Sequence, residues 1–491
     1  MTKPLDSTLQ LDFSWLAQKP QEQVIACDID CYKFFAALRA HSADSYYFES
    51  LALPRHQDRY YTMGFDPELI FAARGNHLSI RGNTIRLAST LGTHALVRAE
   101  INAQGIAKMD YHLANPYLFL KQQYKCTCFA GSHYSGLVGY FSYEAVNYFE
   151  PGLQLPEHPD FRTFQFGLYS DGLIYDMTTA TLTYYTFAED RSAFVRDLCR
   201  NIDKTHIPRK LSAVAFQGHS CDKAQFTAAV ARTQKKIKTG YSFQAEVGFK
   251  SYYRIKGDKL AIYSHLREVN PGPYMYYLKF GQEELFGASP EILISNKSGS
   301  LLTTPTAGTI ARGQTAAEDI RLARQLLRDP KEIAEHHMLV DLHRNDLARV
   351  AVPGSVKIAD LMYIIRFSHV QHIVSNVVGL LQPSKTAFDA LAAIFPGGVV
   401  TGAPKIETIK IIHENEQQPR GPYGGAVGRF ALNGDCEFCL PIRSIFCYGD
   451  QAYIQTSAGI VHDSVPEKEY QEVQNKLAAM RQVLQDLSEG I

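Results

Sequence analysis

The second half of the chain shows the clearest periodicity of apolar and polar positions. Apolar side chains recur at helical spacing over residues 226–237 and Gly240 follows, so this stretch predicts an amphipathic helix that ends at a glycine. Residues 243–249 alternate with a period of two, which predicts a strand. The alternation places Gln244 and Glu246 together on the polar face of that strand.

A second amphipathic helix is predicted at the end of the chain. Its apolar positions recur every three or four residues, and Ser464 with Glu467 fits a capping box at its start. Glu469, Glu472 and Lys476 recur at positions i, i+3 and i+7. These three side chains therefore share a face of the helix that is distinct from its apolar stripe.

The first 215 residues predict many short strands and few helices. Their short apolar runs are separated by turn residues and glycines, a pattern typical of antiparallel sheets. Residues 202–222 form a loop-rich connection. We therefore divide the chain into an N-terminal segment, 1–215, and a C-terminal segment, 216–491.

Composition narrows the class of protein. The chain has 491 residues and is 45% hydrophobic, which is typical of a globular protein. It carries no net charge, so the sequence gives no sign of a basic surface for nucleic acid. The sequence contains neither a signal-like N-terminus nor an apolar run of about 18 residues, so we expect a cytoplasmic protein without membrane spans. Cys436 and Cys439 form a lone Cys-x-x-Cys, and we interpret them as strand cysteines, because a zinc site would need further ligands.

Two Glu-x-x-Glu pairs are the first candidates for chemistry. Glu332 and Glu335 follow Pro330 in a predicted helix, and Glu469 and Glu472 lie on the terminal helix. A single pair of this kind is usually solvated surface charge. Two pairs that converge could instead hold Mg²⁺, which prefers oxygen ligands and commonly binds one or two carboxylates together with anionic groups of a substrate.

Glycine-rich loops are the second candidates. They occur at residues 307–309, 396–405, 421–428 and 456–461. Glycine lets backbone N–H groups approach an anion closely, although each loop taken alone is as well explained by a turn. Neither the Walker spacing nor Gly-x-Gly-x-x-Gly is present, so nucleotide binding is not indicated. Together with Arg443 and the paired acids, the loops suggest a small polyanionic substrate.

The sequence of the second half resembles that of a known family, the chorismate-utilising enzymes, and most closely that of its anthranilate synthase branch. The resemblance covers about residues 220–485, with weaker matches at YFES, GFDP and GYFSYE in the first half. It implies an α+β fold with large mixed or antiparallel sheets packed as a sandwich and helices on the outside. The matching motifs are GASPEIL, AGT, AEHHMLVDLHRNDLARV, FSHVQHIVS, TGAPK, RGPYGGAVG, PIRS and AGIVHDSVPEKE.

The resemblance also implies roles for individual residues. Glu335 and Glu472 match the Mg²⁺ ligands, Glu469 supports them, and Glu332 matches an acid that protonates the departing 4-hydroxyl of chorismate. His372 matches a residue that transfers a proton in pyruvate elimination. The substrate contacts that it implies are Gly308, Thr309, Tyr423, Arg443, Ser457, Ala458, Gly459 and Lys476.

Two uncharged residues indicate the branch of the family. Family members that add water to chorismate share a lysine, which acts as a base, at the position of Gln244. Members that make aminodeoxychorismate typically have a lysine at the position of Ala307. The combination implies that ammonia adds to chorismate and that anthranilate and pyruvate are released. The ammonia would come from a separate glutamine amidotransferase subunit. Aminodeoxychorismate synthase component I and a non-catalytic ligand-binding homologue stay as alternatives.

The resemblance also implies a feedback site for L-tryptophan. The N-terminal segment, 1–215, would supply one wall of that site and would also contact the partner subunit. The segment NPGPYMYYL matches the family's tryptophan-binding stretch, and YFES matches the opposite wall. This sequence departs from the family at Val399, at Arg429, where a tyrosine is common, and at Thr456 and Ser457, which replace Ala-Gly. The implied tryptophan contacts are Glu49, Ser50, Pro273, Tyr274 and Met275.

Overall fold

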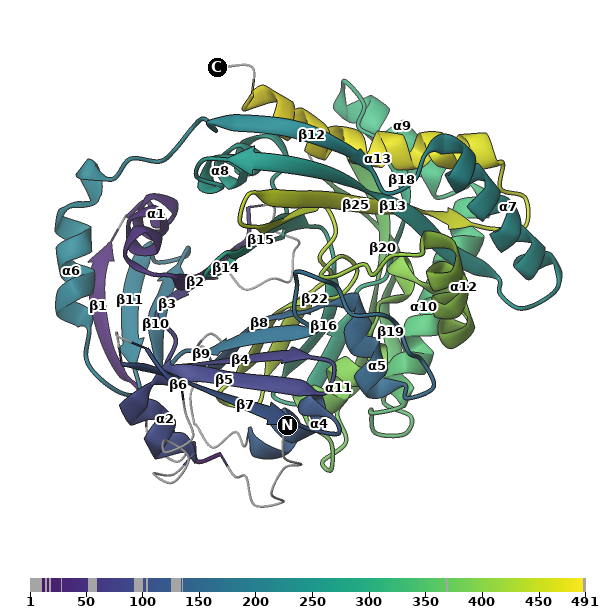
Figure 1. Cartoon of the computed structure of the whole chain (residues 1–491). Helices are drawn as coiled ribbons and strands as arrows, with labels where there is room; N and C mark the ends of the chain where they lie inside the picture. Colours follow the sequence, from purple (N-terminus) through teal and green to yellow (C-terminus); the bar gives the residue numbers. More distant parts are fainter. Residues whose placement is uncertain are drawn as a thin grey trace.

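The computed structural model describes residues 11–13, 16, 19–27, 29–51, 60–91, 100–102, 105–124, 134, 136–367 and 370–488. Two large sheets, in which every pairing is antiparallel, face each other, and helices cover the outer side of each (Figure 1). The predicted α+β sandwich is therefore confirmed. None of the described helices combines the length and the apolar character that crossing a membrane requires.

One sheet holds the strand that begins at Gln244. In spatial order its strands are β1 (Gln21–Cys27), β11 (Thr181–Thr186), β10 (Asp171–Asp176), β3 (Tyr60–Phe65), β2 (Asp44–Glu49), β14 (Tyr274–Phe280), β15 (Glu283–Ser289), β24 (Ser444–Tyr448), β25 (Gln451–Ile460), β13 (Gln244–Lys256) and β12 (Ala213–His219), with β21 (Gly402–Ala403) paired to β13. We call it the first sheet.

The second sheet holds the strands next to the predicted acids. Its order is β18 (Thr306–Ala311), β20 (Val370–Leu380), β17 (Ser300–Thr303), β16 (Ile292–Lys297), β23 (Cys436–Cys439), β22 (Ala426–Ala431), β8 (Gly136–Phe141), β9 (Phe164–Leu168), β4 (Leu69–Arg74), β5 (His77–Asn83), β7 (Ile106–His112) and β6 (Glu100–Ile101), with β19 (Lys357–Arg366) paired to β20.

The helices pack on the outer faces of the two sheets. Those against the first sheet include α1 (Cys31–His41), α6 (Ser192–Arg200), α7 (Lys223–Lys238), α8 (Leu260–Val269) and α13 (Pro466–Asp486). Those against the second include α2 (Thr84–Leu91), α9 (Ala316–Leu326), α10 (Pro330–Ala348) and α11 (Ala387–Ile394). The remaining ones are α4 (Pro116–Gln123), α5 (Val146–Phe149) and α12 (Lys405–Glu416), of which α12 packs along β13.

Most of the helix and strand predictions are confirmed, and one cap is wrong. α7 buries the predicted stripe and has an Asp222 capping box, and Cys436 and Cys439 are free cysteines in β23. Ser464, however, does not cap α13. Val465 is the N-cap and makes no side-chain hydrogen bond, while the Ser464 hydroxyl accepts from the Val461 N–H at 3.0 Å.

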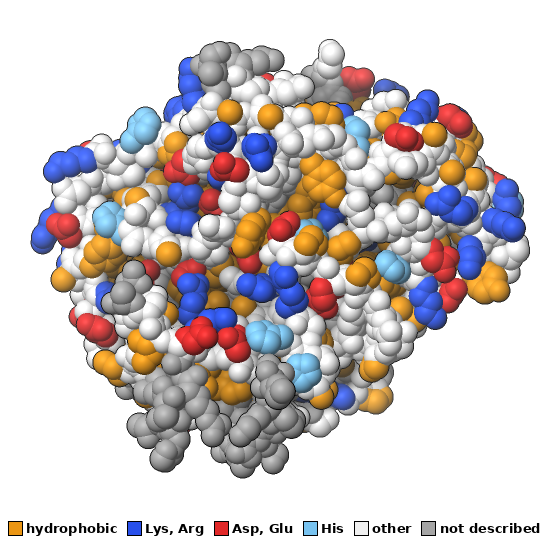
Figure 2. Space-filling view, in the orientation of Figure 1, with side chains coloured by type: hydrophobic (Ala, Val, Ile, Leu, Met, Phe, Trp, Pro, Cys, Tyr) orange, Lys and Arg blue, Asp and Glu red, His pale blue; other side chains and the backbone are white. Residues whose placement is uncertain are grey.

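The predicted boundary near residue 215 falls inside β12, so the connection contains a strand as well as loops. Strands from both sides of this boundary pair in each sheet, as β2 does with β14 and β8 with β22. The division into two segments stays a prediction. Figure 2 shows acidic and basic side chains interspersed over one face of the molecule, in keeping with zero net charge.

The interior of the sandwich is aromatic, with Tyr46, Tyr140 and Tyr276 among its fully buried side chains. The buried cation Arg420 lies among aromatic rings. Its guanidinium forms two hydrogen bonds to Glu416, at 2.9 and 2.7 Å, and stands 4.6 Å from the centre of the Tyr143 ring. A buried charge costs several kcal/mol of desolvation unless it is paired in this way.

The same guanidinium joins separate parts of the fold. It donates to the Val400 carbonyl at 2.6 Å and to the Glu246 carbonyl at 2.7 Å. Glu416 in turn accepts from the Gly248 N–H at 2.9 Å. Arg420 therefore links α12 and the loop after α11 to β13, the strand that carries Gln244.

Replacement of Arg420 by methionine should destabilise the protein by about 3–5 kcal/mol, because it leaves a buried carboxylate and two carbonyls without their donor. The measurement is the urea midpoint at pH 7.5. Arg344→Met is the matched control, since Arg344 forms an exposed pair with Asp341 and its loss should cost less than about 1 kcal/mol. Equal effects of the two substitutions would contradict the role given to Arg420.

Candidate active site

The predicted acids lie on two helices. Glu332 and Glu335 occupy the first turns of α10, where Asp329 caps the helix and Pro330 takes the first position. Glu469 and Glu472 occupy the start of α13. Proline at this position costs no hydrogen bond, because the first N–H groups of a helix have no partner within it.

Two buried histidines hold α10 on the second sheet. His336 Nε2 lies 2.7 Å from the Ser375 hydroxyl on β20, and His343 Nδ1 lies 2.8 Å from the Thr303 hydroxyl on β17. Burial lowers the pKa of His336 to about 4 and that of His343 to about 3. Both side chains are therefore neutral at physiological pH and act as polar anchors for the helix that carries the acids.

The acids of the two helices influence one another across the site. Burial and then the neighbouring charge of Glu335 raise the pKa of Glu332, and Glu472 on the other helix adds to the rise. Burial and Glu472 likewise raise the pKa of Glu469, against the opposing hydrogen bond of Ser464. Within the described residues, no group of three or more His, Cys, Asp or Glu side chains forms a metal cluster of its own.

Gln244 connects this acidic region to the first sheet. It is the first residue of β13, as the alternation predicts, and its side chain is buried. Its Nε2 lies 3.1 Å from Glu335 Oε1 and 3.3 Å from Glu246 Oε1. A residue of the first sheet and an acid of α10 therefore meet directly.

His372 on β20 and Arg443, just before β24, form a second pair of candidate residues. Arg443 Nη2 lies 2.8 Å from His372 Nε2. Because guanidinium can only donate, Nε2 must accept, so Nδ1 carries the proton and donates to the Gly308 carbonyl at 3.2 Å. Burial and then the Arg443 charge lower the pKa of His372 to about 3, and burial lowers that of Arg443 to about 10.

Gly308 and Thr309 lie beside this pair at an irregularity in β18. The register with β20 shifts between Ala307 and Thr309, and Gly308 takes the left-handed conformation, φ 74°, that glycine adopts without strain. Thr309 Oγ1 lies 2.9 Å from His372 Nδ1. A Cβ added to Gly308 would stand 3.1 Å from Glu332 Oε2, so this glycine also brings the backbone against the acid.

The remaining predicted substrate contacts form a third group on β25, on α13 and in the turn before β22. The Ser457 hydroxyl lies 3.1 Å from the Tyr423 hydroxyl. Lys476 Nζ donates to the Ser457 carbonyl at 2.9 Å and lies 2.8 Å from Glu472 Oε1. Desolvation opposes the charge of Lys476, but Glu246 and Glu472 outweigh it and raise its pKa.

Ala458 and Gly459 follow Ser457 along β25. They pair with Val247 and Glu246 of β13. β24 pairs with β25 only at residues 451–453, so near Ser457 to Gly459 one edge of the strand is not covered by that neighbour.

Glu246 is a site residue to which the sequence reasoning assigned no role. It is buried, and the Ser457 hydroxyl donates to its Oε2 at 2.6 Å. Burial raises its pKa to about 7, although Lys476 and Ser457 limit the rise. The signal was present in the sequence, because the alternation of β13 places Glu246 on the face of Gln244.

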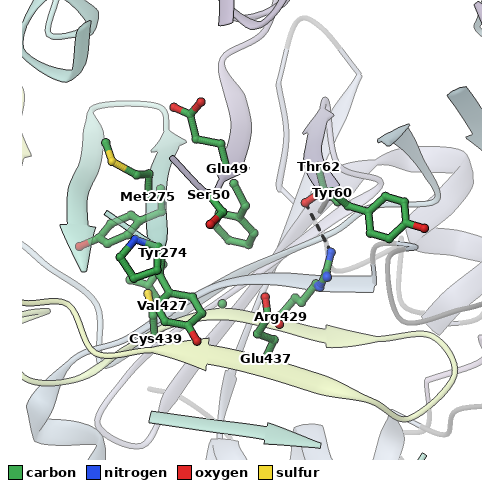
Figure 3. Close-up of a pocket in the computed structure, with 14 residues that line it drawn as sticks. Glu49, Ser50, Tyr60, Thr62, Tyr274, Met275, Val427, Arg429, Glu437 and Cys439 are labelled. Carbon is green, nitrogen blue, oxygen red and sulfur yellow. Dashed lines mark hydrogen bonds between the residues drawn. The ribbon is translucent and has the colours of Figure 1, made fainter. Parts of the chain in front are cut away.

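A separate pocket between the two sheets contains all five predicted tryptophan residues. It is lined by Glu49, Ser50, Pro273, Tyr274 and Met275, and also by Thr62, Arg429 and Glu437 (Figure 3). The Glu49 carboxylate points away from the cavity and pairs with Arg267 at 2.7 Å. Arg429 approaches Thr62, with 3.4 Å between Nη1 and Oγ1.

The sandwich and its acid-lined site agree with a family comparison. The family model of chorismate binding enzymes matches residues 82–482, so the chain belongs to the chorismate-binding enzyme family. Anthranilate synthase component 1 of Leptospira biflexa is 40% identical over 479 residues, which cover 97% of this chain and 98% of that protein. Aminodeoxychorismate synthase component 1 of Bacillus subtilis is 39% identical over 369 residues, which cover 72% of this chain and 77% of that protein.

A solved structure gives the same result. The crystal structure of anthranilate synthase component I from Streptococcus pneumoniae superposes with a TM-score of 0.72 at 29% sequence identity. The superposition covers 88% of this chain and 94% of that one. The chain thus shares both the fold and nearly the full length of a component 1 protein.

The buried histidines predict a pH dependence of stability. The folded-state pKa of His343 is about 3, whereas the unfolded value is near 6.5. Below about pH 6.5 the unfolded chain therefore binds more protons, and the stability that depends on neutral His343 is lost as the pH falls towards 3. We expect the difference in unfolding free energy to shift in favour of His343→Leu by up to about 1.4 kcal/mol per pH unit below 6.5.

The measurement is urea unfolding at pH 7.5, 6.0 and 5.0. His462→Leu is the control, because the His462 side chain is 66% exposed. A stability difference between His343→Leu and the unsubstituted protein that stays constant with pH would contradict this account.

Proposed function

We propose that this protein converts chorismate and ammonia to anthranilate and pyruvate, as the synthase component of an anthranilate synthase. The near full-length similarity to component 1 of Leptospira biflexa supports the proposal. The observation that carries it is the neutral amide of Gln244, 3.1 Å from Glu335, where a water-adding enzyme would need a basic lysine. Ala307 supports it further, because alanine offers no amine for covalent attack.

The acid region fits Mg²⁺. Its donors are carboxylate oxygens on two helices, which raise one another's pKa and so favour a cation between them. Glu335 and Glu472 would hold the ion, and Glu469 would support them. When bound, the ion would neutralise the ring carboxylate of chorismate and withdraw electron density from the ring that reacts.

Arg443 is suited to the second carboxylate of chorismate, on the enolpyruvyl group. A guanidinium can form two parallel hydrogen bonds to a carboxylate. In the structure it donates to His372 Nε2 instead. A carboxylate that draws Arg443 away would leave the Nε2 lone pair of His372 available to accept a proton during pyruvate elimination.

Glu332 is suited to the departure of the 4-hydroxyl. Loss of that group as water requires a proton, and the raised pKa of Glu332 favours the protonated acid. Gly308 lies against its carboxylate, and Thr309, Tyr423, Lys476 and the backbone of Ser457 to Gly459 complete the proposed substrate contacts. Ammonia would be supplied by a glutamine amidotransferase subunit.

The test is to incubate the purified chain with chorismate, Mg²⁺ and an ammonium salt at alkaline pH, and to follow anthranilate fluorescence. We expect fluorescent product without any added partner, because the salt replaces the amidotransferase. A non-fluorescent aminated product that needs an added lyase would instead indicate aminodeoxychorismate synthase. Unchanged chorismate would refute both and leave a ligand-binding homologue.

Variants of the acids provide the internal control for this assay. Glu335→Gln or Glu472→Gln keeps the size of the side chain but removes its charge, so we expect at least a 100-fold loss of kcat/KM. Glu437→Gln lies in the other pocket and should retain activity. Mg²⁺-dependent activity that persists in both acid variants would exclude them as ligands.

L-Tryptophan is the proposed inhibitor at the pocket of Figure 3. The pocket lies between strands of the two sheets, and Ser50, Pro273, Tyr274 and Met275 line it. Ser50→Leu should fill part of this space and raise the half-inhibiting concentration of L-tryptophan at least tenfold, with kcat within about twofold. D-Tryptophan serves as the ligand control. Equal inhibition of the unsubstituted protein and of Ser50→Leu by L-tryptophan would exclude this pocket.

A further inference from the structure

The Gln244 amide is held by two carboxylates on one side. Its Nε2 stands 3.1 Å from Glu335 Oε1 and 3.3 Å from Glu246 Oε1. An amide nitrogen only donates and an amide oxygen only accepts, so the nitrogen must face the two carboxylates. The opposite end, Oε1, is a hydrogen-bond acceptor, and it receives no hydrogen bond from the residues that the structure describes.

Glu246 is itself fixed in place. The Ser457 hydroxyl donates to its Oε2 at 2.6 Å, while its Oε1 faces Gln244. Its backbone carbonyl accepts from Arg420 at 2.7 Å. Glycine at 459 makes room for the arrangement, because a Cβ there would lie 2.5 Å from Gln244 Nε2 and 2.8 Å from Glu246 Oε1.

We propose that Glu246 is a positioning residue that orients the Gln244 amide so that its Oε1 accepts an N–H hydrogen bond from the attacking ammonia. The inference rests on the proposed function, in which ammonia is the nucleophile. Ammonia is a donor through its three hydrogens and attacks through its lone pair. One hydrogen bond to an acceptor oxygen therefore orients the molecule and leaves the lone pair free. Gln244 forms no covalent bond and takes no proton.

Glu246 contributes through the direction of the amide. With Glu335 as the single carboxylate neighbour, the amide could rotate and present its nitrogen to the nucleophile. A second carboxylate on the same side disfavours that rotamer, because the amide oxygen would then face two acceptors. The consequence is a role specific to ammonia, separate from the binding of chorismate by Arg443.

The experiment is Glu246→Gln with separate titrations of the two substrates. We expect the KM for ammonium to rise about tenfold, the scale of one charge-assisted hydrogen bond, with the KM for chorismate within about twofold. Glu283→Gln is the matched control. Glu283 is also a buried carboxylate of the first sheet and accepts from the Tyr140 hydroxyl at 2.6 Å, so its ammonium KM should not change.

Gln244→Leu tests the same step without altering Glu246. It removes the acceptor, so the ammonium KM should rise about as much, and the double variant should add little, as expected for two residues that act as one unit. If Glu246→Gln does not fold, as judged by its thermal transition, Ser457→Ala replaces it with an expected rise of about threefold.

Two results overturn the proposal: an unchanged ammonium KM in Glu246→Gln and Gln244→Leu, or an equal rise in the KM of both substrates. Neither is confused with failure of the proposed function. If the proposed function fails, the unsubstituted protein makes no anthranilate from chorismate and ammonium. If only the role of Glu246 fails, the unsubstituted protein makes anthranilate normally.

Discussion

The buried ion pair of Arg420 and Glu416 is the constraint around which the site is arranged. The guanidinium is buried, and its desolvation would be prohibitive without a charged partner. It directs two further donors to the carbonyls of Val400 and Glu246, which belong to a loop and to a strand. The backbone N–H of Arg420 donates to the Glu144 carboxylate at 2.6 Å. Since a buried charge tolerates little displacement, these segments are fixed relative to one another.

That fixed frame explains how the site can hold so many acids. The charges of Glu246, Glu332, Glu335 and Glu472 influence one another, and the cation Lys476 lies 2.8 Å from Glu472. Like charges that interact in this way would push flexible side chains apart. Here His336 and His343 anchor α10 on the second sheet, so the helix that carries Glu332 and Glu335 cannot move away without breaking buried hydrogen bonds. The carboxylates therefore continue to repel one another, and this repulsion favours the binding of a cation between them.

The sequence predicted local features well because local features follow from periodicity. The pattern around Phe226 and the alternation around Gln244 correspond directly to α7 and β13. The Ser464 cap failed because Pro466 starts the helix one residue later than a capping box would, leaving Val465 as the cap residue. Contacts between distant segments had no such signal. The 2.8 Å contact of Arg443 with His372 and the hydrogen bonds of Arg420 join residues far apart in the chain, and periodicity carries no information about them.

One strand, β22, runs from the candidate active site to the proposed tryptophan pocket and connects them physically. β22 begins three residues after Tyr423, whose hydroxyl contacts Ser457 in the candidate active site, and Arg429 of the same strand lines the tryptophan pocket. The strand is paired on both edges, with β8 and with β23, so it can shift only together with its neighbours. In a close-packed interior such a shift is transmitted rather than absorbed. A ligand that separated β14 from β22 in the tryptophan pocket would therefore displace the loop that carries Tyr423, without any contact between the ligand and the reacting groups.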